Sequence, residues 1–277
     1  SRFGPYRMTI IDLVARQKVF EQTNAAVDVE VSPNGRFIAI QGAIPNLYMD
    51  ANTFDTVATD SGAGGGGSWD STGNIFYSVR RRGGLSYIRR FDLTTRLALS
   101  ETPYVDNAYP GSYVYRVQPT ADLNKVFLYI YYGQNRGRVV SYNLADSTIG
   151  FSYWIGSQNT EMTITPDWKT ILFTDPENFD NWDVYRSVYM VDAISDQLES
   201  IIPPPPPPYY GVPDPNLYFN PVQIAITPDG EYAMASTGLQ FCCWVGLLSL
   251  RDRKYVEFFQ TDTLWNEPTA VACRAKL

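Results

Sequence analysis

The sequence contains no histidine, only three cysteines and few charged residues, which make up 18% of its 277 positions. Without histidine, the chain lacks the usual general base at neutral pH, the Ser-His-Asp triad and the commonest zinc ligand. It also has no Gly-x-Ser-x-Gly elbow, P-loop or Rossmann fingerprint. These absences argue against triad hydrolases, zinc enzymes and the common nucleotide-binding classes.

Three cysteines, Cys242, Cys243 and Cys273, are too few for a disulfide framework. They predict either one bridge, from Cys242 or Cys243 to Cys273, or three buried thiols. The chain begins at Ser1 without a methionine, which is typical of a processed product and favours an extracellular or secretory location.

The net charge is −7 and the isoelectric point is about 4.7, so we expect no nucleic-acid partner. The one basic run, Arg80 to Arg82, is too short to change this expectation. No apolar stretch reaches the length of a membrane-spanning helix, so we expect no membrane partner either.

Aromatic residues make up 14% of the chain, and 20 glycines and 19 prolines interrupt it. Strong β formers separated by turn formers indicate an all-β protein. The length suits one large all-β domain or two average ones. The run Gly64 to Gly67 looks at first like a linker between two domains.

A repeated hairpin argues for one domain. Three segments share a plan of strand, Pro-containing turn and strand: VDVEVSPNGRFIAI from Val27, MTITPDWKTILF from Met162 and VQIAITPDGEYAMA from Val222. The stretch GGSWDSTGNIFYS fits the same template, with Asp70 at the Ser32 position and Gly73 at the Gly35 position. The glycine run therefore falls in register with an inner strand, where it opens space on one side of the channel. A flexible linker is the alternative.

A second hairpin follows each first one, and a polar residue marks its turn at intervals of about 38 to 57 residues. These residues are Asp12, Asp50, Asp92, Asn143, Asp192 and Ser249. Four antiparallel strands per unit form the blade of a β-propeller. We therefore expect a single β-propeller domain over residues 1–277.

The two hairpin motifs in series resemble the repeats of the YVTN and lactonase-like propellers, and the resemblance covers nearly the whole chain. It implies the propeller fold. The lactonase-like branch of that family generally relies on acidic and histidine residues around the channel, so a chain without histidine departs from its pattern. A lactonase-like hydrolase is therefore kept only as an alternative function.

The ends of the chain predict how the propeller closes. EPTAVACR, from Glu267, aligns with the inner strand NPVQIAIT, from Asn220, but no hairpin follows it. The N-terminal hairpin around Asp12 has no inner hairpin before it. We expect six blades, with one blade closed by strands from both termini; seven blades are the alternative.

Long connections emerge at one end of such a propeller, and we expect the binding site there. Pro203 to Pro208 would form a stiff polyproline II segment, either a wall beside the channel mouth or a ligand for an aromatic-groove domain. The expected ligand-binding residues are Tyr131, Tyr132, Trp182, Tyr218, Phe219, Phe241, Trp265, Asn266 and Gln223. Polar residues that share one face of the inner strands are Asp28, Glu30, Ser68, Arg116, Glu161, Thr163 and Gln223.

These residues favour a monomer that binds a small, largely apolar or aromatic molecule at the channel mouth. An enzyme using that pocket would need histidine-free, cofactor-independent chemistry, such as cyclisation, cycloaddition or isomerisation in natural-product metabolism. Glu161 or Glu267 would then accept a proton and Arg116 would orient the substrate, although Glu161 and Arg116 would also suit a structural ion pair. A non-catalytic scaffold for a protein partner is the alternative.

No cofactor is expected. Calcium is the one metal for which the sequence offers ligands, because four acidic residues of one segment carry the oxygen ligands that it prefers. They are Asp175, Glu177, Asp180 and Asp183. Solvated loop acids are the alternative, and the spacing does not match an EF-hand.

Overall fold

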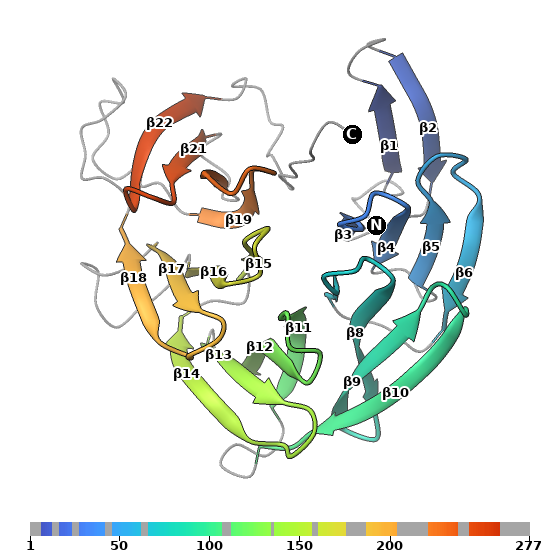
Figure 1. The fold of residues 1–277 in the computed structure, drawn as a ribbon, viewed down its shortest axis with the longest axis horizontal. Coiled ribbons are helices and arrows are strands. Elements are labelled where there is room, and N and C mark those ends of the chain that lie inside the picture. The colour runs from blue at the N-terminus through green and yellow to red at the C-terminus, as the bar shows by residue number, and fades with distance from the viewer. Residues whose placement is uncertain are drawn as a thin grey trace. The chain divides into compact units, whose positions relative to one another are not determined.

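The computed structural model describes residues 7–12, 17–23, 28–41, 46–61, 66–106, 112–133, 136–156, 160–175, 187–203, 221–237 and 244–260. Its regular elements in these ranges are the strands β1 to β22 (Figure 1). Within the described ranges, no helix is long and apolar enough to cross a membrane. The prediction of an all-β protein is confirmed.

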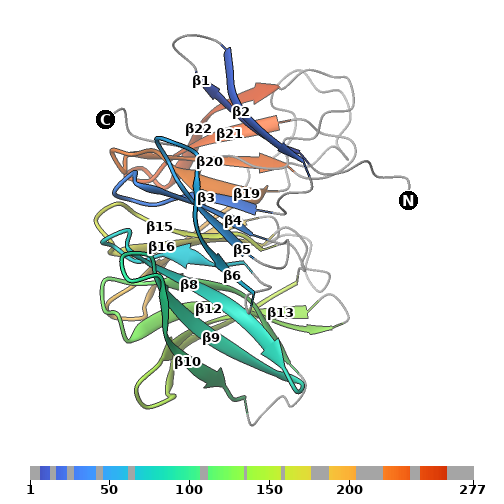
Figure 2. The same ribbon diagram turned by 90° about the vertical axis from the view of Figure 1, so that its right-hand side faces the viewer.

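The chain divides into two compact units, of which the first comprises Ser1–Ile130 and Asn143–Thr148. It begins with a two-stranded sheet, β1 (Arg7–Asp12) and β2 (Gln17–Thr23). Blade 1 contains β3 (Asp28–Val31), β4 (Phe37–Gln41), β5 (Asn46–Asp50) and β6 (Thr56–Asp60). Blade 2 contains β7 (Ser68–Trp69), β8 (Ile75–Arg82), β9 (Leu85–Asp92) and β10 (Leu97–Tyr104), and Figure 2 shows its three long strands side by side.

The second unit comprises Tyr131–Tyr142 and Ile149–Leu277, so blade 3 has strands in both units. Blade 3 contains β11 (Tyr113–Pro119), β12 (Lys125–Gly133), β13 (Arg136–Asn143) and β14 (Ile149–Ile155). Blade 4 contains β15 (Met162–Ile164), β16 (Thr170–Asp175), β17 (Ser187–Asp192) and β18 (Leu198–Ile202). Blade 5 contains β19 (Pro221–Ile226), β20 (Tyr232–Thr237), β21 (Trp244–Ser249) and β22 (Lys254–Gln260).

The fold is a β-propeller with five blades, so the predictions of six or seven blades were wrong. The predicted sixth blade depended on counting the N-terminal hairpin as half of a composite sheet. In the described part of the chain, β1 and β2 pair only with each other. The segment from Glu267, which was expected to supply the inner strand, lies outside the described residues.

The turns of the first hairpins follow the pattern that the sequence predicted. A side-chain oxygen before each turn accepts the backbone N–H of the residue five positions later, at 2.9–3.0 Å; these residues are Ser32, Asp70, Thr165 and Thr227. Three positions beyond each lies a residue in the left-handed region, namely Gly35, Gly73, Trp168 and Gly230. The alignment of Asp70 with Ser32 and of Gly73 with Gly35 is therefore confirmed.

The turns of the second hairpins are equally regular. In each, a side-chain oxygen accepts a backbone N–H two or three residues later, which closes the turn; these residues are Asp50, Asp92, Asn143, Asp192 and Ser249. Four positions later the backbone is left-handed, at Phe54, Arg96, Ser147, Asp196 and Arg253. The polar residue thus stabilises a turn that needs one residue at positive φ, a conformation that costs about 1 kcal/mol for a side-chain-bearing residue.

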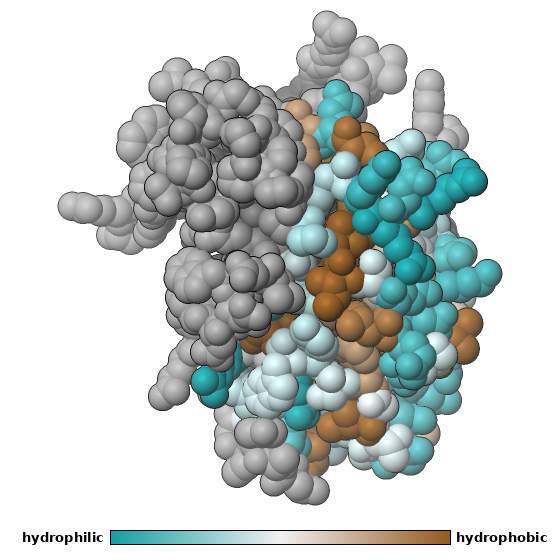
Figure 3. All heavy atoms as spheres, turned by 90° about the vertical axis from the view of Figure 1, so that its left-hand side faces the viewer, coloured by the Kyte–Doolittle hydropathy of each residue, from teal (hydrophilic) through white to brown (hydrophobic). Residues whose placement is uncertain are grey.

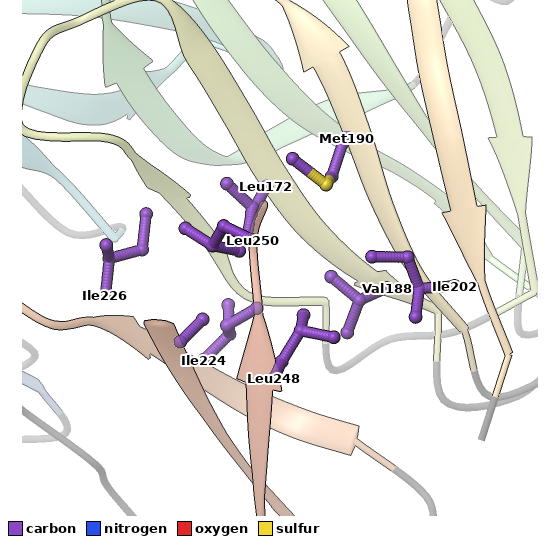
Figure 4. Close-up of a cluster of buried hydrophobic side chains, with 9 residues drawn as sticks. Leu172, Val188, Met190, Ile202, Ile224, Ile226, Leu248 and Leu250 are labelled. Carbon is purple, nitrogen blue, oxygen red and sulfur yellow. The ribbon is translucent and has the colours of Figure 1, made fainter. Parts of the chain in front are cut away.

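Each unit has its own hydrophobic core. In the first unit, Trp69 stacks near Phe37, while Tyr48 packs against Phe76 and Phe91 at ring distances of 5.4 and 5.2 Å. In the second unit, β16, β17 and β18 meet β19 and β21 through the aliphatic cluster of Figure 4, whose labelled members are Leu172, Val188, Met190, Ile202, Ile224, Ile226, Leu248 and Leu250. Burying each such side chain contributes about 1.5–3 kcal/mol, so this cluster stabilises the packing of blade 4 against blade 5.

Two residues of the glycine run, Gly66 and Gly67, lie in the described part of the chain and form hydrogen bonds with neighbouring blades. Gly66 forms a parallel bridge with Arg116: its N–H donates to the Tyr115 carbonyl at 3.0 Å, and the Val117 N–H donates to its carbonyl at 3.1 Å. Gly67 exchanges two hydrogen bonds with the side-chain amide of Gln41. Gly66 and Gly67 therefore connect blades 1, 2 and 3 and are not a flexible linker; Gly64 and Gly65 lie outside the described residues.

Replacing Gly67 by alanine should destabilise the fold strongly. The new Cβ would overlap the backbone carbonyl of Tyr77 and come within 2.7 Å of the Phe76 ring. Both neighbours are buried and packed, so we expect a loss of more than about 2 kcal/mol in the free energy of unfolding. Thermal or urea unfolding followed by circular dichroism measures it.

Gly66→Ala is the matched control. Its Cβ would come within 2.7 Å of Arg116 Cγ, so the Arg116 side chain would have to shift, whereas the obstacle at Gly67 is main chain and a buried ring. Gly66→Ala should therefore cost less than Gly67→Ala. Equal losses, or no loss for Gly67→Ala, would contradict the close approach at Gly67.

Candidate functional site

The structure describes five of the residues that the sequence nominated for a site. Arg116 lies in the first unit, and Tyr131, Tyr132, Glu161 and Gln223 lie in the second. The other nominated residues lie outside the described part of the chain: Trp182, Tyr218, Phe219, Phe241, Trp265, Asn266 and Glu267. Cys242, Cys243, Cys273 and residues 204–208 of the proline run also lie outside it.

Arg116 has a structural partner in blade 1. Its guanidinium donates to the Asp28 carboxylate at 3.0 Å, and the two side chains are 21% and 23% exposed. The stem of Arg116 lies over Gly66, where a Cβ would come within 2.7 Å of Arg116 Cγ. This ion pair joins β3 to β11 within the first unit, whereas the pairing of Arg116 with Glu161 stays a prediction.

Glu161 and Gln223 lie on neighbouring sheets of the second unit. The Glu161 backbone N–H donates to Thr174 Oγ1 at 3.1 Å, and the Thr174 hydroxyl donates to the Val222 carbonyl at 3.2 Å. Thr174 thereby links the start of β15 to β19, at Val222, the residue that precedes Gln223. Both nominated side chains are half-buried, and their roles in binding or catalysis stay predictions.

A compact group of aromatic and cationic side chains lies on blade 3 in the second unit. Tyr132 and Trp154 approach with ring centroids 5.2 Å apart. The Arg138 guanidinium lies 5.7 Å from the Tyr132 ring and 5.6 Å from the Trp154 ring. Arg138 is 9% exposed, whereas Trp154 is 43% exposed. We call Tyr132, Arg138 and Trp154 the blade 3 patch.

The backbone explains this geometry. Arg138 and Trp154 are direct cross-strand partners on β13 and β14, so their side chains project from the same face of the sheet. Cross-strand pairing therefore places the cation beside the indole. Nominated Tyr131 precedes Tyr132 on β12 and is half-buried.

A charged network lies between blades 1 and 2 of the first unit. Arg89 donates to Asp60 at 2.8 Å and also to Glu101, and Arg80 donates to Glu101 at 2.8 Å. Asp60 is buried, and the neighbouring Tyr48 is fully buried. Burial raises the pKa of Tyr48, and the Asp60 carboxylate adds to that rise. Tyr48 is therefore a neutral hydroxyl at physiological pH.

Most of the residues predicted as calcium ligands lie outside the described part of the chain. Asp175 is fully buried, and its carboxylate accepts the Gly156 N–H at 3.1 Å. Glu177, Asp180 and Asp183 lie outside the described residues. Among the residues that are described, no group of three or more acidic or cysteine side chains is placed to hold a metal ion.

The sequence predictions missed Arg138 and Trp154, and also the network around Arg89. The signal that was available is a strand with two arginines at alternate positions, RGRVVSYN, followed after a short turn by a strand with three aromatic residues, IGFSYWI. Arg80 to Arg82 were considered only as a nucleic-acid signal. Cross-strand partners could be identified only once the register of β13 and β14 was known.

Comparisons with known proteins show the fold and not a family. No family model matches the chain, and no curated protein matches it, so membership of the YVTN and lactonase-like superfamily is not confirmed.

Solved structures do resemble it. Hydrazine synthase from Kuenenia stuttgartiensis matches with a TM-score of 0.66 at 16% identity, over 95% of this chain and 82% of that one. The β-propeller domain of Cps50 (Swd1) from Myceliophteria thermophila matches with a TM-score of 0.66 at 14% identity, over 96% and 83%. TolB from Acinetobacter baumannii matches with a TM-score of 0.59 at 14% identity, over 93% and 60%. Proteins with such different names share this architecture, so it identifies a β-propeller and leaves the function to the residues.

The network around Arg89 predicts a pH dependence of stability. Hydrogen bonds from Arg80 and Arg89 hold the pKa of Glu101 below its ordinary value of 4.5. A carboxyl group with a lowered pKa in the folded state stabilises that state above pH 4.5, and this contribution is lost as the pH falls through the folded-state pKa. Glu101→Gln should lower the free energy of unfolding at pH 7 and lose less of it between pH 5 and pH 3 than the wild type.

Urea unfolding across that pH range measures the effect, with Glu257→Gln, at an exposed position on β22, as the control. The control curve should run parallel to that of the wild type. A Glu101→Gln curve that also runs parallel would show that the network does not stabilise the ionised carboxylate.

Proposed function

We propose that this chain is a ligand-binding propeller and that its ligand is a small aromatic molecule held by the blade 3 patch. The observation that supports this most is the exposure of Trp154, 43%, beside Tyr132 and above a nearly buried Arg138. A large aromatic side chain left half in water on a rigid strand can gain free energy when another ring covers it. The blade 3 patch is the surface that we propose for the apolar or aromatic ligand that the sequence predicts.

The cation beside the two rings favours particular ligands. A guanidinium next to an aromatic pair adds attraction for electron-rich rings and for ligands that carry a partial negative charge. Because Arg138 is held between cross-strand neighbours, it need not be ordered when the ligand binds, which lowers the entropic cost of binding.

The catalytic part of the prediction is a further proposal. Histidine-free cyclisation, cycloaddition or isomerisation would rely on holding the bound molecule in a reactive conformation, with Glu161 as the proton acceptor in the second unit. Glu267 and Arg116 are the other candidates that the sequence nominated. A lactonase-like mechanism has no support from the residues, because the chain contains no histidine.

A protein-interaction scaffold is the second candidate function, and exposed apolar side chains on edge strands favour it. Leu97 and Leu99 on β10 are 63% and 50% exposed. Figure 3 shows another side of the molecule, where hydrophobic residues lie among hydrophilic ones. Edge strands with apolar residues are places where a second chain can pair.

Native mass spectrometry of the protein from its own source, followed by denaturing extraction, tests the two functions. We expect a copurified aromatic molecule whose dissociation constant rises about tenfold in Trp154→Ala, which corresponds to about 1.4 kcal/mol of binding free energy, so that its occupancy in the variant falls. Trp154→Phe should keep most of the ligand, because it keeps a ring. Leu97→Ala, at an exposed apolar position in the other unit, should keep all of it.

Two results would contradict the proposal. Equal occupancy in the wild type and Trp154→Ala would place the ligand elsewhere. An empty protein that carries a stoichiometric protein partner, lost in Leu97→Ala, would favour the scaffold.

A further inference from the structure

A second arginine and aromatic group lies in the first unit, at the tip of the hairpin formed by β8 and β9. The Arg81 guanidinium carbon lies 3.7 Å from the centre of the Tyr113 ring and 5.7 Å from that of Tyr115. The Tyr113 and Tyr115 ring centres are 5.8 Å apart. Arg81 is exposed, and Tyr115 is 44% exposed.

The backbone fixes this group in place. Gly83 and Gly84 have φ values of +61° and +81°, as a tight two-residue hairpin turn requires, so the tip of β8 and β9 is short. Ser86 lies directly opposite Arg81 in that hairpin, and its buried hydroxyl accepts the Val114 N–H at 3.0 Å. This hydrogen bond ties the start of β11 to the hairpin tip, which places Tyr113 against the Arg81 guanidinium.

Arg81 also differs from Arg80 and Arg89 in its charge environment. Arg80 and Arg89 are neutralised by Glu101 and Asp60. Among the described residues, neither Arg81 nor Arg82 has a carboxylate partner. A positive charge is thus presented at the surface of a protein whose net charge is −7.

Stacking on a ring leaves a guanidinium able to bind an anion. The ring covers one face of the planar cation, while its N–H donors point outward in that plane, in the spacing that a carboxylate accepts with both oxygens. Because the ring restricts the side chain, less rotational entropy is lost on binding. The exposed ring of Tyr115 lies beside this cation, at the distance that a group attached to the carboxylate would span.

We propose that Arg81, Tyr113 and Tyr115 form a binding site for an aromatic carboxylate. The carboxylate accepts two hydrogen bonds from Arg81, and the ligand's ring stacks on Tyr115. The site does not depend on the blade 3 patch, because all three residues belong to the first unit and the patch belongs to the second.

The test uses 2-naphthoate and its neutral analogue 2-naphthamide, with binding measured by isothermal titration calorimetry at low salt. We expect naphthoate to bind at least tenfold more tightly than naphthamide. Arg81→Gln should abolish this preference, and Arg81→Lys should keep only part of it, because lysine has the charge without the planar pair of donors. Tyr115→Leu should weaken both ligands.

Arg82→Gln is the matched control. It removes the same charge from the same hairpin tip, but successive residues of a strand face opposite ways, and Arg82 lies over Tyr87 at 5.3 Å. Naphthoate affinity should therefore stay within about twofold of the wild type. Trp154→Ala should leave it unchanged as well, which separates this site from the proposed function.

Several outcomes would overturn the inference. They are equal affinities for the two probes, no binding of naphthoate at millimolar concentration, or equal losses in Arg81→Gln and Arg82→Gln, which would indicate a diffuse charge effect. Arg81 and Arg82 are both exposed, so we expect their variants to fold. Amide NMR spectra of each variant check this.

Discussion

The first unit depends on one close approach of backbone to backbone, at Gly66 and Gly67. At Gly67 a side chain would overlap the Tyr77 carbonyl and the Phe76 ring, and at Gly66 it would displace the Arg116 side chain. Without side chains, the peptide groups of both glycines can pair with β11 on one side and with Gln41 on the other. The backbone hydrogen bonds of these two glycines therefore link three successive blades, in addition to the hydrophobic contacts between the blades.

Both proposed sites use arginine where many binding sites use histidine or metal. Arginine stays charged at every physiological pH, so its contribution to binding does not depend on titration. In the blade 3 patch the cation is nearly buried beside two rings, and at the β8 and β9 tip the cation is exposed over one ring. These environments suit different ligands: the first favours a ring, and the second favours an anion attached to a ring.

The sequence predicted local structure well, because the turns depend on residues that are close together in the chain. The hydrogen bond from the Phe37 N–H to Ser32 and the positive φ of Gly35 follow directly from the Ser-Pro-Asn-Gly motif. The number of blades was wrong, because a count of hairpins does not show whether the two ends of the chain complete a sheet. A two-stranded pair, β1 with β2, has the same local signature as half of a blade.

The candidate sites were predictable only in part, since their members are distant in sequence. Tyr132 was predicted to lie in a long connection, but it lies on β12, and Trp154 joins it through the register of two further strands. Arg116 was correctly placed on an inner strand, yet its partner Asp28 lies 88 residues away. Residue propensity and spacing predict which face of a strand a side chain occupies. The residue that it contacts on that face depends on how the blades pack.

Hydrogen exchange at two backbone amides tests the central claim most directly. The Gly67 N–H is bonded to Gln41 and buried, and the Gly66 N–H is bonded to the Tyr115 carbonyl. In native-state exchange followed by NMR, both should be protected to a degree comparable with the core strands of blade 2. Exchange at the rate of an unstructured peptide would show that the glycine run is a linker, and it would contradict the structural role of Gly66 and Gly67.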